Sequence, residues 1–510
     1  MRIVAFAALA LVWMASVLFR LDELTLQSGA PSLEATYHAA WTMKVLSEAP
    51  IASHALLPSV VLDPLVGDTL LWGATPPTKG GGLIYTSFPP AGFVGPLAAL
   101  SIFGVQVSAS SLIVFNALLG LATAFVMLFL MREVMRLIPS KDRVPFAGTW
   151  MVSSLLAGCY LWSSEALLTH GAVYWAHSVS QVFFVGACLM FLRHQAFGLR
   201  PLSIFGIAVL CGGFALLEWT GYVFNAGLTS ILIIQAFRSE GAKRKEHLLL
   251  AVSIAGATLL VLIGTVIHYA SMIGFEAMFE TSLSRAERRS GFSDPMGSLS
   301  ALPNAYLVSF GLLVPLAIFA VFKLYKTGHL IGPVGLVILA AFLPMLENLV
   351  LMDHALSYSF DRLKLSVPLL MALAAWIACL SGRRALQVSV FCVAAIGLSG
   401  AVIYEFRTLP YSAWRDVQYQ NDTRVLDISS DPLADCAVYG HARSTRGYLN
   451  LLLDRDVYER SSLQEMVLAA QVKQACAIVY METSAPYRDI TLIDKFSVYD
   501  PEGNLLRSGN

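Results

Sequence analysis

The residues best suited to chemistry in this sequence are Glu34 and His38, in the segment PSLEATYHAAW. A spacing of four residues places both side chains on one face of a helix. A carboxylate there can act as a general base that removes a proton from a hydroxyl group, and the imidazole can orient or assist it. The segment also has the features of an ordinary helix start, because Pro31 and Ser32 precede a first-turn Glu that the helix dipole favours. Both interpretations stay open.

A second set of residues has the chemistry to hold a phosphate group. The segment SRAERRS contains Arg285, Arg288 and Arg289. A guanidinium is planar, and its forked donors match phosphate oxygens. Arg362 and Lys364 in DRLKLSVP form another cationic pair. The alternative for both sets is an interfacial location, where the cations meet lipid headgroups.

The amino-acid composition indicates what kind of protein positions these residues. Hydrophobic residues make up 56% of the 510-residue chain and charged residues only 13%, which is far more apolar than a soluble domain. We therefore interpret the chain as a polytopic membrane protein. The formal net charge of zero gives no indication of a nucleic-acid partner, and we predict none.

Eleven apolar stretches are long enough to cross a bilayer, which takes about 17 to 25 residues. They cover residues 3–19, 107–131, 146–163, 173–192, 202–218, 220–237, 247–269, 305–322, 330–351, 364–381 and 386–405. The loops after the even-numbered spans are basic, for example at Arg132, Lys243 and Arg383. By the positive-inside rule these loops and the N-terminus are cytoplasmic, and the C-terminal tail is extracytoplasmic. We expect an integral protein of a bacterial inner (plasma) membrane.

Two parts of the sequence are not spans. Residues 20–106 form a long first outer loop, with one short helix predicted at about 33–47 and another after YTSFPPAG. Pro96 and the short apolar length place the second helix along the interface, or re-entrant, rather than across the membrane. Hydropathy drops in residues 406–510, where the runs CAVYGHA, GYLNLLL, CAIVYME and FSVYD predict strands and SLQEMVLAAQVKQ predicts a helix. The predicted fold is an all-α polytopic membrane domain, residues 1–405, with a small C-terminal α/β extracytoplasmic domain.

The cysteines follow the same division. Five of the seven lie in apolar spans, where a thiol behaves as a small hydrophobic group. Cys436 and Cys476 each begin a predicted strand of the outer domain, in a compartment that would allow a disulfide. These two cysteines are candidates for a disulfide bond.

Eleven ionisable residues map to the outer span ends or the outer loops. They are Glu165, His170, His177, Glu218, His268, Glu347, Asp353, His354, Asp361, Arg362 and Lys364. Charges at membrane depth are costly and tend to mark functional sites. A channel or proton-coupled carrier would more usually place such charges near the bilayer midplane. The outer face is therefore the candidate functional face.

The order of the motifs resembles the GT-C glycosyltransferases. A first span ends in an Arg, an acidic residue opens a short outer helix (SLEATYHAAWTMKVLSE), and a double-proline element (YTSFPPAG) and a late DRLKLSVPLL follow. More narrowly, this order is similar to the branch of the protein O-mannosyltransferases and the lipid A aminoarabinose transferase. The resemblance covers about residues 1–405. It implies an enzyme that takes a sugar from a polyprenyl-phosphate donor, among membrane lipids, and passes it to a glycan, lipid or protein acceptor at the outer face.

One position departs from the family pattern. The family's first-loop signature is Asp-Glu-Ala-x-Tyr, and Leu33 stands here where the aspartate, the family's base or metal-facing carboxylate, is expected. Leucine cannot accept a proton, so that role would pass to Glu34, with Asp22 and Glu23 as alternatives, and His38 would assist. Tyr85 of the double-proline element could line the cleft. The spacing predicts no metal site, because no third protein ligand is evident; a divalent cation stays open as a cofactor.

The predicted function is that of a membrane glycosyltransferase with an extracytoplasmic active site. Glu34 is the leading base, and the arginines of SRAERRS, with Arg362 and Lys364, are the candidate phosphate holders. Two other functions stay open. A transporter or flippase of lipid-linked saccharides would need a polar path through the membrane, and a catalytically silent scaffold would agree with Leu33.

Overall fold

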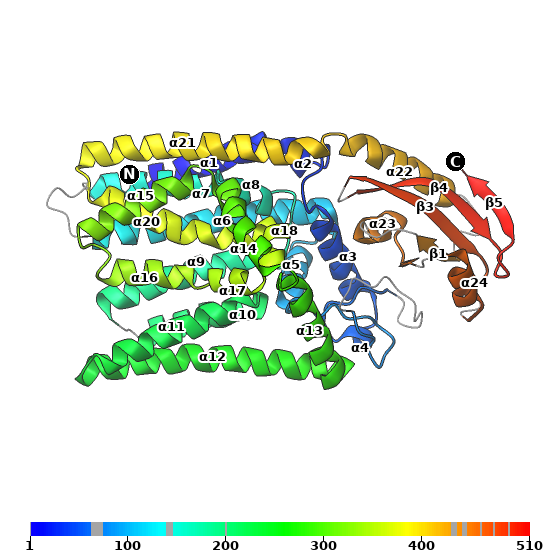
Figure 1. Cartoon of the computed structure of the whole chain (residues 1–510), viewed down its shortest axis with the longest axis horizontal. Coiled ribbons are helices and arrows are strands. Elements are labelled where there is room, and N and C mark those ends of the chain that lie inside the picture. The colour runs from blue at the N-terminus through cyan, green and yellow to red at the C-terminus, as the bar shows by residue number, and fades with distance from the viewer. Residues whose placement is uncertain are drawn as a thin grey trace.

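The computed structural model is a long molecule with a helical bundle at one end and a small sheet at the other (Figure 1). It describes residues 2–62, 75–138, 146–198, 201–429, 436–440, 446–459, 462–472, 475–487 and 490–509. Helix α3 (Glu34–Glu48) lies between the bundle and the sheet domain. The candidate residues of the first outer loop are therefore where the two parts meet.

Apolar helices of different lengths build the bundle. They are α1 (Arg2–Phe19), α6 (Ala109–Leu137), α7 (Phe146–Leu161), α9 (Ala176–Phe197), α10 (Pro201–Leu217), α11 (Thr220–Phe237), α12 (Gly241–Ile273), α14 (Pro295–Phe310), α15 (Leu313–Lys326), α16 (Pro333–Phe342), α17 (Met345–Val350), α20 (Ser366–Ala378) and α21 (Gly382–Thr408). Their inner faces form one continuous apolar core, which includes Leu156, Phe184 and Leu370. Many of their outer side chains are apolar and exposed, as expected for helices that face lipid.

The eleven predicted spans can be compared with the helices of the described chain. Each predicted span coincides with helix, but seven helices of the described chain are long and apolar enough to cross a membrane, or eight if a bent pair counts as one span. Helices α7, α10 and α20 have only 16, 17 and 13 residues. The bent pair is α14 and α15, which meet at an angle of 99°. Hydropathy along the sequence does not detect bends, so the count of eleven spans stays a prediction.

Short helices lie at the end of the bundle nearest the sheet domain (Figure 1). They are α2 (Leu21–Leu24), α4 (Ile51–His54), α5 (Ala91–Ile102), α8 (Ser164–Thr169), α13 (Phe275–Arg289), α18 (Met352–Ser357), α19 (Ser359–Arg362) and the 3₁₀ turn Leu363–Leu365. The predicted helix at 33–47 is confirmed as α3. Helix α5 has 12 residues with Pro96 inside it, so it is too short to cross a bilayer.

Helix α3 is held in place by the segment between α8 and α9. The Thr36 hydroxyl donates to the carbonyl oxygen of Ala172 (2.6 Å) and accepts from the backbone N–H of Tyr174 (2.8 Å). The Trp41 ring is fully buried, and its N–H donates to the carbonyl of Val60 (3.0 Å). These contacts fix the direction in which the first turn of α3 presents its side chains.

The C-terminal part is a five-stranded mixed sheet with helices. After the 3₁₀ turn Leu409–Tyr411 come α22 (Trp414–Ser429), β1 (Ala437–Gly440), α23 (Arg446–Leu453), β2 (Val457–Glu459), α24 (Leu463–Val472), β3 (Ile478–Tyr487), β4 (Ile490–Tyr499) and β5 (Leu505–Gly509). The strand order is β2-β1-β3-β4-β5. Strand β1 is parallel to β2 and β3, whereas β4 is antiparallel to β3 and β5. A small α/β domain is thus present, and its division from the bundle at residue 405 stays a prediction.

One predicted strand of this domain is a helix. The run GYLNLLL lies in α23, with Tyr448 and Leu449 buried. A short apolar run fits either a buried strand or one face of a helix, so periodicity alone does not separate them. The helical run SLQEMVLAAQVKQ contains α24, as expected.

Cys436 and Cys476 are joined by a disulfide, with their Cα atoms 5.6 Å apart, directly before β1 and β3.

Candidate active site

A cavity of about 300 Å³ opens between α3, the double-proline loop, α13 and the α18–α19 segment. Its lining residues are Ser32, Glu34, Ala35, His38, Tyr85, Phe88, Trp175, Arg285, Arg289, His354, Tyr358 and Phe360. Glu34 and Arg285 are far apart in the sequence, yet both reach this space. Five residues that the sequence nominated, Glu34, His38, Tyr85, Arg285 and Arg289, thus line one cavity.

The Glu34 carboxylate is held by the C-terminal domain. Its Oε1 accepts a hydrogen bond from the backbone N–H of Gly447 (2.8 Å), in the first turn of α23. A Cβ atom on Gly447 would lie 2.7 Å from the backbone nitrogen of His38 and 2.8 Å from the carbonyl carbon of Tyr37, so only glycine permits this approach. The Tyr37 and Tyr448 rings also meet edge to face, 5.1 Å apart. Helix α23 therefore positions the first turn of α3.

Leu33 does not share this environment. Its side chain is 1% exposed and packs in an apolar cluster with Ala30 and Tyr37. It does not line the cavity. Glu34 is consequently the carboxylate of this segment that faces the cavity.

His38 lies deeper in the same cavity, among aromatic rings. Its imidazole meets the Tyr85 and Trp175 rings edge to face, at 4.7 and 5.2 Å. Burial, and next the positive charge of Arg285, hold the pKa of His38 well below its usual range. The ring is therefore neutral at pH 7, and a neutral imidazole can accept a proton or a hydrogen bond.

Arg285 and Arg289 face the cavity from one side of α13. The Arg285 Nε donates to the Ser87 hydroxyl (2.8 Å), and its Nη2 donates to the Tyr85 hydroxyl (3.3 Å). The Arg289 guanidinium lies over the Phe88 ring, 5.7 Å from its centre. The double-proline loop therefore orients both guanidinium groups without neutralising their charge.

The remaining cationic candidates are placed differently. Arg288 is exposed and lines neither this cavity nor the next one described. The buried Arg362 donates from Nε and Nη2 to Glu165 Oε1 (both 3.2 Å), and its Nη1 donates to the carbonyl of Ala355. Lys364 pairs with Glu218. The geometry gives no support to these three residues as phosphate holders, because Arg288 points away and the other two cations are engaged by buried carboxylates.

The alternative bases in α2 are also remote from the cavity. Asp22 is exposed and Glu23 is half-buried, and neither lines the cavity. The burial of Glu23 raises its pKa. Both residues lie in α2, before the turn that connects α2 to α3, so their side chains are not at the cavity that Glu34 lines.

A second cavity, of about 240 Å³, adjoins the first. It is lined by Thr86, Ser87, Phe88, His177, Glu218, Trp219, Ser282, Arg285, Ala286, Arg289, Glu347, Leu351, His354 and Asp361. The two cavities share Phe88, Arg285, Arg289 and His354. The two arginines thus stand at the boundary between a cavity with Glu34 and a cavity with buried charges.

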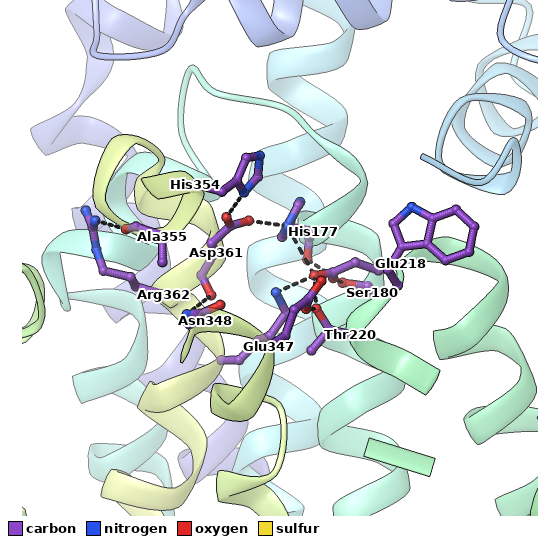
Figure 2. A network of polar contacts seen from close by, with 12 residues as sticks. His177, Ser180, Glu218, Thr220, Glu347, Asn348, His354, Ala355, Asp361 and Arg362 are labelled. Carbon is purple, nitrogen blue, oxygen red and sulfur yellow. Dashed lines mark hydrogen bonds and ion pairs between the residues drawn. The ribbon is translucent and has the colours of Figure 1, made fainter. Parts of the chain in front are cut away.

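A buried network of charged and polar side chains forms the floor of the second cavity (Figure 2). His177 Nε2 lies 2.6 Å from Asp361 Oδ1 and 3.1 Å from Glu218 Oε1, and His354 Nδ1 pairs with Asp361 Oδ2. The Thr220 hydroxyl bridges Glu218 and Glu347. Burial favours the neutral acid of Asp361, but the interactions with His354 and His177 outweigh it and hold the pKa of Asp361 well below its usual range. Asp361 is therefore an ionised, hydrogen-bonded acceptor between two histidines.

This network does not fit a divalent cation. Among the residues that the structure describes, no three His, Cys, Asp or Glu side chains are arranged to hold a metal ion. The carboxylates already have positive partners, because Lys364 contacts Glu218 and His177 contacts both Glu218 and Asp361. The donor set is that of an ion-pair network, so we derive no step through a metal.

The sequence did not nominate the residues of this network as a site. Its available signal was the position of Glu218, Glu347, His354 and Asp361 at outer span ends, where charges are costly. The spacing along the chain carries no further signal, because three separate stretches of the chain, residues 177–180, 218–220 and 347–362, supply the side chains. Only the packing of these segments assembles the network.

The comparisons with known proteins identify the fold. No protein-family model and no curated protein matches the sequence. The structure matches GT-C membrane glycosyltransferases. ArnT from Cupriavidus metallidurans bound to undecaprenyl phosphate has 12% identity and a TM-score of 0.55, and the match covers 98% of this chain and 97% of ArnT.

The archaeal oligosaccharyltransferase of Archaeoglobus fulgidus has the same fold over a larger chain. Its complex with Zn and sulfate gives 11% identity and a TM-score of 0.57, with 93% of this chain and 68% of that chain covered. The AglB complex with an inhibitory peptide and a dolichol-phosphate gives 11% identity and a TM-score of 0.55, with 94% and 69% covered. At these identities the matches establish the fold. The resemblance inferred from the motifs is confirmed at that level.

Proposed function

We propose that this chain, which has the fold of GT-C membrane glycosyltransferases, moves a sugar from a polyprenyl-phosphate donor to an acceptor at the outer face of the membrane. The observation that carries the proposal is one cavity with Glu34 on one wall and Arg285 and Arg289 on the other. The full-length similarity to ArnT bound to undecaprenyl phosphate supports the same donor class. A base and a phosphate-binding pair are the two groups that this transfer needs.

Glu34 would act on the acceptor. Its carboxylate takes the proton of an acceptor hydroxyl while that oxygen forms a bond to the anomeric carbon of the sugar. Gly447 holds Oε1 through its backbone N–H, so the carboxylate has a fixed orientation when the acceptor arrives. Neutral His38, four residues further along α3, can accept a hydrogen bond from the acceptor or orient it.

Arg285 and Arg289 would act on the donor. As the new bond forms, the bond between the anomeric carbon and the phosphate oxygen breaks, and its electron pair stays on the lipid phosphate. Forked guanidinium donors stabilise that developing charge. Ser87 and Tyr85 orient Arg285 before the donor binds, which reduces the reorganisation that the reaction requires.

The direct test is sugar transfer by the purified protein in lipid. Radiolabelled polyprenyl-phosphate sugars are supplied with glycan, lipid and peptide acceptors, and label is followed from donor to acceptor. We expect Glu34→Gln to reduce transfer by at least about 100-fold, the lower range for a general base. Glu48→Gln, at the exposed end of the same helix, is the matched control. Full activity of Glu34→Gln would refute the assignment of the base.

A catalytically silent scaffold is the second candidate, because Leu33 occupies the family's aspartate position as a buried core residue. In that case no donor is consumed by the wild-type protein under any acceptor condition, although the donor lipid binds. The same assay therefore separates the two functions.

A further inference from the structure

A third cavity lies at the end of the bundle opposite the candidate active site. It has a volume of about 380 Å³ and is lined by Arg136, Arg193, His194, Phe197, Gly198 and Ser203. Helix α9 connects the two ends, since His177 is in its first turn and His194 is in its last. A helix of this length spans about 30 Å, so the third cavity is separate from the proposed transfer site. By the positive-inside rule it faces the cytoplasmic leaflet.

The third cavity lies beside an excess of positive charge. The carboxylate of Glu133 is buried, with the guanidinium groups of Arg132, Arg193 and Arg136 at 3.0, 3.5 and 3.6 Å. Three cations therefore surround one carboxylate. The side chains of Arg193 and Arg136 are 48% and 55% exposed, and both line the cavity. Their remaining donors are available to an anion.

His194 supplies a second, independent observation. Its side chain is 3% exposed, and neither ring nitrogen has a hydrogen-bond partner among the residues that the structure describes. Glu246 Oε1 lies 3.6 Å from Nδ1, which is too long for a hydrogen bond. A buried polar group without a partner is costly, and such groups usually meet water or a ligand.

We propose that the third cavity binds a phosphate group, carried by a lipid headgroup or free in solution. Arg136 and Arg193 supply the charge-assisted donors, and His194 supplies a neutral donor. Phe197 is 58% exposed and stacks under the Arg136 guanidinium, 5.1 Å away, so an apolar surface adjoins the polar cavity. This arrangement suits a phosphate with an acyl chain beside it. The proposal is independent of the transfer reaction.

The test measures thermal unfolding of the full-length protein in detergent micelles. One arm adds phosphatidylglycerol, with phosphatidylcholine as the zwitterionic comparison, and the other adds inorganic phosphate, with chloride at equal ionic strength. We expect phosphatidylglycerol to raise the midpoint temperature of the wild type. The half-saturating concentration should rise by about tenfold in Arg193→Gln, because a charge-assisted contact is lost.

His194→Phe is the second variant, because it keeps an aromatic ring against Phe191 and His247. It should weaken the same response even if Arg193→Gln folds poorly. Arg384→Gln is the matched control, because it removes one exposed positive charge at the same end of the bundle without lining the cavity.

Each outcome decides the proposal. A response to phosphatidylglycerol alone supports a lipid headgroup, and a response to both additives supports phosphate itself. Identical responses to phosphatidylglycerol and phosphatidylcholine, with none to inorganic phosphate, overturn the proposal. Equal weakening by Arg384→Gln also overturns it, because the effect would then be one of general charge.

Discussion

Replacing Gly447 with alanine tests whether the C-terminal domain positions the candidate base. The added Cβ atom would lie 2.7 Å from the backbone nitrogen of His38, whereas an ordinary contact begins at 3.4 Å. Helices α23 and α3 must therefore separate by about 0.7 Å. The hydrogen bond from Gly447 to Glu34, now 2.8 Å, would lengthen to about 3.5 Å and be lost.

The expected consequence is a catalytic defect with little change in donor binding. A misplacement of about 1 Å can cost about 100-fold in rate, so a displacement of this size should reduce kcat by roughly 10- to 100-fold. The KM for the donor should change less than threefold, about 0.6 kcal/mol, because Arg285 and Arg289 are held by another loop. Overpacking should also lower the free energy of unfolding by about 1–3 kcal/mol.

The assay is sugar transfer at several donor concentrations, below the midpoint temperature of the variant. Gly95→Ala is the matched control, because a Cβ atom there meets nothing within 4 Å. Wild-type kcat in a folded Gly447→Ala protein would refute the positioning role. A rise in donor KM alone would show that α23 acts on the donor side instead.

Three further predictions concern residues around the site. Arg285→Gln should raise the donor KM by about tenfold, because a charge-assisted contact is lost. Arg288→Gln should leave the donor KM unchanged, and transfer rates at several donor concentrations measure both values. Arg362→Leu should destabilise the protein by about 1–3 kcal/mol, because the buried Glu165 loses one of its two arginine partners and keeps Arg407 at 3.1 Å. Thermal unfolding measures this change, and a midpoint equal to wild type would contradict it. Burial, and next the positive charge of Arg20, lower the pKa of His170 to about 3. In the unfolded chain this pKa is about 6.5, so the unfolded chain takes up the proton at a higher pH than the folded protein. The free energy of unfolding should therefore fall by about 1.4 kcal/mol per pH unit as the pH decreases below about 6.5. His170→Gln should remove that part of the pH dependence, and unchanged slopes would count against it.

The sequence predicted where the helices lie along the chain better than it predicted how the helices pack and cross the membrane. The helix at 33–47 and the eleven apolar segments were placed correctly, because local periodicity and hydropathy are properties of neighbouring residues. The number of spans stays a prediction, since the bend between α14 and α15 and the length of α20 depend on neighbouring helices. The run GYLNLLL was predicted as a strand but forms helix α23, because packing against other segments decides between the two.

The candidate site shows the same difference. Glu34 and the arginines of SRAERRS were nominated from residue chemistry, and the structure brings Glu34, Arg285 and Arg289 to one cavity. The sequence could not separate Arg285 from Arg288, which are three residues apart on one helix. The direction in which α13 packs decides which of them faces the cavity.

By itself, the sequence indicated that this is an integral membrane protein, that ionisable residues gather at one set of span ends, and that an acidic residue opens the helix of the loop after the first span. These follow from the free energy of each side chain in water or lipid, which local composition records. Only the tertiary structure decided that Arg362 pairs with Glu165 while Arg285 remains at a cavity, and that Gly447 holds Glu34. Such pairings depend on packing between segments hundreds of residues apart, and no local pattern encodes that geometry.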